Sequence, residues 1–202
     1  MISQMEFVRR VDVQTETIER YVREGKLVPD MVVPMSEHRM FKYFKEESLC
    51  KYAKQYGWTI IDNSNRKDMF MDMIRQMDMS YSYKPILWKA ILLKADNSGR
   101  VQLDDIVSYF RVFFDKRRLL GLPVEKAKSI YLNANITDKQ ILQNILIYPY
   151  KRFEDMGVLH HTKTLGIIQV DESVWKKLED RDRKEILSIC DKKLDVYFKR
   201  IK

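Results

Sequence analysis

The sequence predicts a mainly α protein of two domains with small β-hairpins. Apolar residues recur at helical spacing along most of the chain, and glycines follow several of these segments. The chain has 202 residues, enough for one large core or two small ones. We expect a first domain at residues 1–60, a connector at 61–82 and a helical second domain at 83–202.

The composition is typical of an intracellular globular protein. No apolar run approaches the roughly 20 residues that cross a bilayer, and the first residues lack the layout of a signal peptide. The two cysteines, Cys50 and Cys190, fall on the apolar faces of predicted helices, and no Cys/His spacing typical of a metal site occurs. We therefore expect a reduced cytoplasmic protein with buried thiols and without a metal or cofactor.

The first domain begins with two short helices. Ser3 and Glu6 form a capping-box pattern that begins a helix ending near Arg10. Thr15 is the predicted N-cap of a second helix, and Gly25 ends it. Two short helices joined by a tight turn predict a helix-turn-helix.

A hairpin and a third helix complete this domain. Extended runs at residues 26–33 and 39–44, separated by residues 34–38, predict a β-hairpin, or wing. A helix over 46–56 then ends at Gly57. Residues 1–60 are therefore predicted to form a winged helix-turn-helix.

This order of elements resembles a known family of DNA-binding domains. The pattern consists of Thr15-x-x-Ile18-x-x-Tyr21-x-x-x-Gly25-x-Leu27-x-Pro29, then Arg39-x-Phe41 and a helix with an acidic start. Over about residues 3–57 the chain resembles the mercury-resistance-type (MerR) and phage excisionase domains, whose second helix enters the major groove. The resemblance implies DNA contacts from the helix by Thr15, Thr17, Arg20, Tyr21 and Arg23, and from the wing by His38, Arg39 and Lys42.

The helical phase agrees with this implication. Ile18 and Val22 lie one turn apart and predict the inner face, so Thr17, Arg20 and Arg23 point outward. Arginine binds guanine edges or phosphates, and threonine contacts phosphates or thymine methyl groups. The alternative is an ordinary solvated helix in a winged domain that binds protein.

The connector contains a group of methionines between residues 69 and 79. Phe70, Met73, Ile74 and Met77 share one helical face, which predicts packing in a core. A homodimer contact is the alternative, because MerR-type regulators dimerise through a helix after the winged domain. The segment here is shorter than their coiled coil.

The second domain is predicted from its own periodicity. The expected elements are helices beginning near Pro85 and spanning 104–120, a helix from the Thr137–Gln140 capping box, a hairpin of 158–161 and 167–170, and a last helix over 181–201. This order predicts a helical, winged-helix-like domain. The runs Ser80–Leu87, Ile145–Phe153 and Cys190–Tyr197 resemble an accessory module at the carboxyl end of bacterial helicase and restriction-type proteins.

Catalytic patterns are absent from the sequence, so we do not expect an enzyme. His160 and His161 are adjacent on a predicted strand and point to opposite faces, which prevents shared metal binding. Glu125 and Lys126 fall in a predicted loop. Lys151 and Arg152, before the second hairpin, suggest a second DNA contact.

The net charge of +8 suits a protein that contacts a polyanion. We expect a sequence-specific binder of double-stranded DNA, acting as a transcription regulator or recombination accessory factor of bacterial or phage origin. The alternative is a non-catalytic docking module that binds a helicase, nuclease or recombinase.

Overall fold

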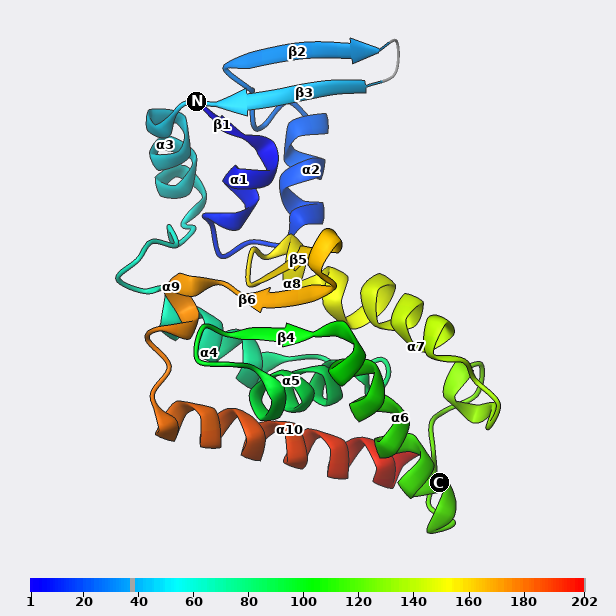
Figure 1. Cartoon of the computed structure of the whole chain (residues 1–202). Helices are drawn as coiled ribbons and strands as arrows, with labels where there is room; N and C mark the ends of the chain where they lie inside the picture. Colours follow the sequence, from blue (N-terminus) through cyan, green and yellow to red (C-terminus); the bar gives the residue numbers. More distant parts are fainter. Residues whose placement is uncertain (37–38, 202) are drawn as a thin grey trace. The chain divides into compact units, whose positions relative to one another are not determined.

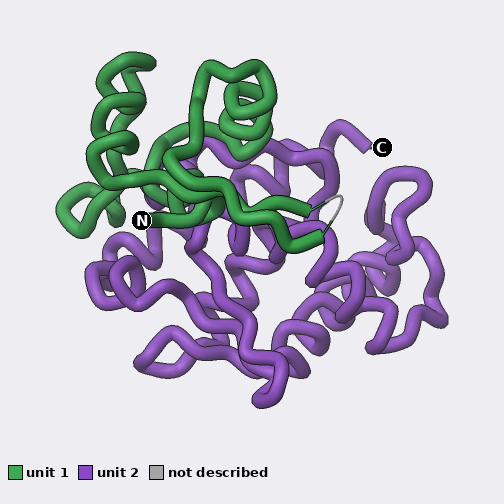
Figure 2. The backbone as a smooth tube through the Cα atoms, turned by 90° about the horizontal axis from the view of Figure 1, so that it is seen from above, with its two compact units in different colours: residues 1–69 green, residues 70–202 purple. Residues whose placement is uncertain are grey.

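A computed structural model describes residues 1–36 and 39–201 (Figure 1). The protein is mainly helical, with two small three-stranded antiparallel sheets. It divides into two compact units, residues 1–69 and 70–202, each with its own core (Figure 2). Within the described ranges, none of the helices combines the length and apolarity needed to cross a bilayer.

The first unit has a small core covered by three helices and a sheet. Its elements are β1 (Ile2–Ser3), α1 (Gln4–Arg9), α2 (Thr15–Arg23), β2 (Met31–Ser36), β3 (Arg39–Phe44) and α3 (Glu46–Tyr56). The strand order is β1-β3-β2. Strand β1 was not predicted because two residues are too few for an alternating pattern; it pairs Ile2 with Phe44. Fully buried side chains include Phe7, Ile18, Leu27, Phe44 and Leu49.

Two predicted boundaries in this unit are wrong. Thr15 is the first helical residue rather than the cap, which is Gln14. The predicted strand over 26–33 begins only at Met31. Its first residues instead close the helix, because the N–H groups of Lys26 and Leu27 both donate to the Tyr21 carbonyl oxygen. Gly25 lies in the left-handed region at φ 69°, as a helix-ending glycine should.

The expected burial of both thiols is only half right. Cys190 is buried, and burial raises the pKa of its thiol to about 12. Cys50 is exposed. On α3, Leu49 and Tyr52 face the core. Cys50 follows Leu49 by one residue, about 100° around the helix, and therefore points away from the core.

The second unit surrounds a larger core. Its elements are α5 (Tyr83–Lys94), β4 (Arg100–Gln102), α6 (Leu103–Leu119), η1 (Ile130–Leu132), α7 (Asp138–Ile145), η2 (Leu146–Tyr150), α8 (Lys151–Asp155), β5 (Leu159–Thr162), η3 (Lys163–Leu165), β6 (Ile167–Val170), α9 (Glu172–Trp175) and α10 (Asp180–Arg200). The helix beginning at the Thr137 capping box is confirmed. Its strand order, β4-β6-β5, again places the first strand beside the last.

The boundary between the units falls inside a helix of the predicted connector. Helix α4 (Arg66–Gln76) buries Phe70, Met71 and Ile74 in the core of the second unit. The Phe70 ring lies 5.0 Å from the Trp88 ring, edge to face. The core interpretation therefore holds for these residues, and the division falls at residues 69 and 70.

Candidate nucleic-acid interface

Helix α2 has one face in the core and one in solvent. Ile18 is fully buried and Val22 partly so, as the periodicity predicted. Arg20 and Arg23 are exposed on the opposite side. Thr15 and Thr17 are half-buried in the first turn of the helix, where the Thr17 N–H donates to the Gln14 carbonyl.

The two arginines of α2 are available for a ligand. Among the residues described, neither Arg20 nor Arg23 forms an ion pair. Glu24, which stands beside them, is bound by Lys26 at 2.7 Å. This hydrogen bond, followed by the charges of Lys26 and the arginines, lowers the pKa of Glu24. One of the glutamates that would repel a phosphate is thus already paired.

Tyr21 has a packing role. Its ring lies 5.0 Å from the Tyr56 ring and 5.8 Å from the Trp58 ring. The cations of Arg20 and Lys26 lie 5.5 Å and 5.1 Å from its centroid. Tyr21 therefore joins α2 to the end of α3.

The wing cations do not share one face of the hairpin. Arg39 and Phe41 lie on one face of β3, and the guanidinium of Arg39 lies 5.4 Å from the Phe41 ring. Lys42 lies on the other face, opposite Val32. His38, the third predicted wing contact, lies outside the described residues.

The hairpin also carries apolar side chains that the sequence analysis did not single out. Met35 is 60% exposed and Met40 58%, which is unusual for side chains of this size on two adjacent strands. Exposed with them are Met31, Val32 and Phe41. The alternating pattern of a hairpin predicts one covered face, whereas here exposed apolar side chains lie on both faces, Met31 and Phe41 on one and Val32 and Met40 on the other.

Positive charge is concentrated in the second unit. Residues 70–202 contain 25 Lys and Arg against 18 Asp and Glu, a net +7, whereas residues 1–69 contain 12 against 11, a net +1. Many cations of the second unit are paired. Lys151, the suggested second DNA contact, binds Glu154 at 3.1 Å and Asp155 at 2.6 Å, which compensates its charge.

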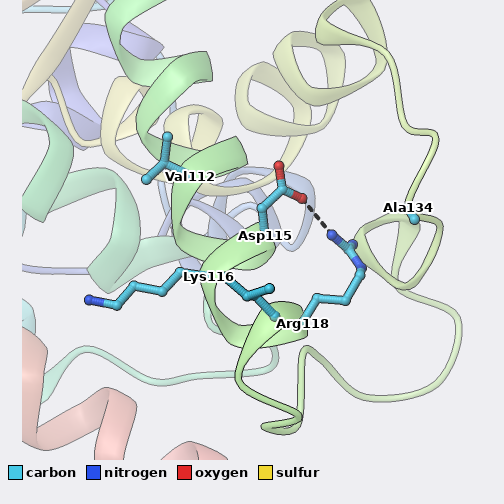
Figure 3. A pocket seen from close by; sticks show the side chains of 6 residues that line it. Val112, Asp115, Lys116, Arg118 and Ala134 are labelled. Atoms are coloured by element: carbon cyan, nitrogen blue, oxygen red, sulfur yellow. Dashed lines mark hydrogen bonds and ion pairs between the residues drawn. The ribbon is translucent and has the colours of Figure 1, made fainter.

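The second unit also has a shallow hollow of about 690 Å³ on the outer side of α6 (Figure 3). It is lined by Val112, Asp115, Lys116, Arg118, Leu119 and Ala134. Arg118 binds Asp115 and donates to the Tyr131 carbonyl at 2.9 Å, which holds η1 against α6. Arg118 therefore has a structural role.

The two histidines point apart as expected. His160 pairs across the sheet with Gln169, and His161 with Ile168, so they lie on opposite faces. His160 Nε2 lies 3.2 Å from Asp171. Within the described chain, no three His, Cys, Asp or Glu side chains cluster closely enough to hold a metal ion.

The first unit thus presents a helix with two unpaired arginines beside an exposed hairpin. Comparisons of the chain with protein-family models, with characterised proteins and with solved structures found no match.

Proposed function

We propose that residues 1–69 form a winged helix-turn-helix that binds double-stranded DNA sequence-specifically, with α2 as the recognition helix and β2–β3 as the wing. The observation that carries the proposal is the outer face of α2. It offers two exposed arginines that form no ion pair within the described residues, on a helix fixed by the buried Ile18. The order β1-α1-α2-β2-β3-α3 supports the proposal, since it brings a second helix and a hairpin together.

In this proposal the two arginines have different tasks from the rest of the surface. A guanidinium can donate two parallel hydrogen bonds to the O6 and N7 atoms of guanine. Phosphate contacts, by contrast, set position without reading sequence. We expect Arg20 and Arg23 to read bases, and Thr17 and Lys42 to contact phosphates. The chain would act as a transcription regulator or a recombination accessory factor.

Arg20→Ala is expected to weaken binding to the preferred site by about 1–3 kcal/mol. The expected loss on unrelated DNA is much smaller, because a single phosphate contact changes non-specific binding only slightly. Fluorescence anisotropy with both DNAs, at constant salt, measures the two losses. Arg181→Ala is the matched control, since it removes one exposed cation of the second unit that pairs with Glu179. Equal losses for the two variants on the specific site would reject α2 as the recognition helix.

A second candidate function is favoured by the exposed hairpin. Met35, Met40 and Phe41 expose apolar area on the hairpin, with Met40 and Phe41 on opposite faces of β3, and exposed apolar side chains of this size are a feature of protein-binding surfaces. The chain would then dock a helicase, nuclease or recombinase. In that case the wild-type chain would co-purify with an enzyme of this class after nuclease treatment. The double variant Met40→Ser with Phe41→Ser would no longer co-purify with it, whereas Arg20→Ala would. Under the DNA proposal, no such enzyme is retained after the nuclease step.

A further inference from the structure

The outer face of α6 is apolar although it faces solvent. Leu119 is 87% exposed and Val112 61%, and the two lie seven positions apart, about two helical turns, so both fall on one line along the helix. Leu120 and Leu122, which follow Leu119 at the end of α6, and Leu132 in η1 are exposed as well. A group of large aliphatic side chains around a hollow differs from the single exposed leucines of ordinary surfaces.

The charges beside this line have both signs. Asp115 and Lys116 lie on opposite sides of it, and Figure 3 shows Lys116 extending away from the Asp115–Arg118 pair. Asp115 is bound by Arg118, while Lys116 has no ion pair among the described residues. Binding of a polyanion requires several unpaired cations, whereas this face has one, Lys116, beside the apolar Val112 and Leu119. A surface that holds both signs next to apolar residues fits a surface of the same kind.

We propose that this face of α6 binds the same face of a second copy of the chain, forming a symmetric dimer. Two such helices can meet parallel or antiparallel. In an antiparallel arrangement centred on residues 115 and 116, each side of the line meets itself, so Asp115 approaches Asp115 and Lys116 approaches Lys116. In the parallel arrangement, with the twofold axis along the helices, Asp115 of one copy meets Lys116 of the other on both sides. The charges therefore favour the parallel dimer over this antiparallel one, and in the parallel dimer Leu119 packs on Leu119 of the second copy.

The proposal does not rest on DNA binding, and the test contains no DNA. Analytical ultracentrifugation of the full chain is expected to show a concentration-dependent dimer of the 24.3 kDa protomer. Leu119→Asp should abolish the dimer. Leu93→Asp, which changes a 54% exposed leucine at the end of α5, should leave it intact. A wild-type chain that stays monomeric up to its solubility limit overturns the proposal. So does a dimer that survives Leu119→Asp, or one that Leu93→Asp also abolishes.

The charge pairing has its own test. Asp115→Lys and Lys116→Asp should each weaken the dimer at least tenfold, because each places like charges together, and the double variant should restore it. Unchanged dimerisation in both single variants contradicts the pairing. In a Cys50→Ser background, Leu119→Cys should form an intermolecular disulfide under mild oxidation. Without such a disulfide in a dimer that still forms, the parallel arrangement is rejected.

Discussion

Glu125→Ala is expected to lower the free energy of unfolding of the second unit by about 3–5 kcal/mol, because it leaves several buried donors without an acceptor. Glu125 is 6% exposed and lies in the segment between α6 and η1. Its carboxyl group accepts hydrogen bonds from the Ser82 N–H at 3.0 Å, from the Ser82 hydroxyl at 2.5 Å and from the Tyr197 hydroxyl. One side chain thus joins the start of α5 to the end of α10.

The experiment is urea unfolding followed by tryptophan fluorescence. In a Trp58→Phe background the remaining tryptophans, Trp88 and Trp175, report on the second unit alone. Glu125→Gln should lose less than alanine, since its amide oxygen still accepts. Glu172→Ala, which removes a surface ion pair with Lys176, should change the stability by at most about 1 kcal/mol. A Glu125→Ala loss as small as that of Glu172→Ala would contradict the role given to this carboxyl group.

Gly99→Ala is expected to destabilise the same unit by about 2–5 kcal/mol, from backbone strain and a steric clash together. Gly99 has φ +78°, and an added Cβ would lie 2.7 Å from Cγ of the Trp175 ring. The ring has little room to move. Its Nε1 donates to the Asn97 carbonyl at 3.0 Å, and the guanidinium of Arg183 lies 3.8 Å from its centroid.

Gly121→Ala is the matched control for this clash. Gly121 has φ +63° at the end of α6, and a Cβ added there has no atom within 4 Å. It should lose only about 1–2 kcal/mol, the strain contribution alone. The same urea experiment compares the two variants. If both variants lost the same free energy of unfolding, the contact of the added Cβ with Trp175 would not contribute to the destabilisation.

The helix ends were predictable because they depend on neighbouring residues. Gly25 and Gly57 both take positive φ where the sequence predicts the ends of α2 and α3. Thr137 caps α7 through the reciprocal pair with Gln140. The inner face of α2 followed from the spacing of Ile18 and Val22, since helical phase is a local property.

The errors and omissions concern contacts between distant segments. The role of Glu125 depends on Ser82 and Tyr197, which lie 43 and 72 residues away in the sequence, and no local pattern indicates it. Strand β1 exists only because β3 offers it a partner. Cys50 was assigned to the apolar face of its helix, but the buried face of α3 consists of Leu49, Tyr52 and Ala53.

In the candidate sites, too, local features were predictable and contacts between distant segments were not. The exposure of Arg20 and Arg23 followed from helical phase, whereas the packing of Tyr21 on Tyr56 and Trp58 required the folded structure. The apolar line on α6 had a local signal that was not used. Val112 and Leu119 are out of phase with the buried Phe110 and Phe114 on the same helix.

In-vitro selection of bound duplexes from a random DNA pool, at near-physiological salt, tests whether α2 reads a DNA sequence. The wild-type chain and Arg20→Ala are selected side by side, and circular dichroism confirms that both are folded. We expect a defined motif for the wild type, and we expect Arg20→Ala to lose at least one of the base preferences of that motif. No enrichment by the wild type, or an identical motif from Arg20→Ala, would contradict the assignment of α2 as the helix that reads DNA.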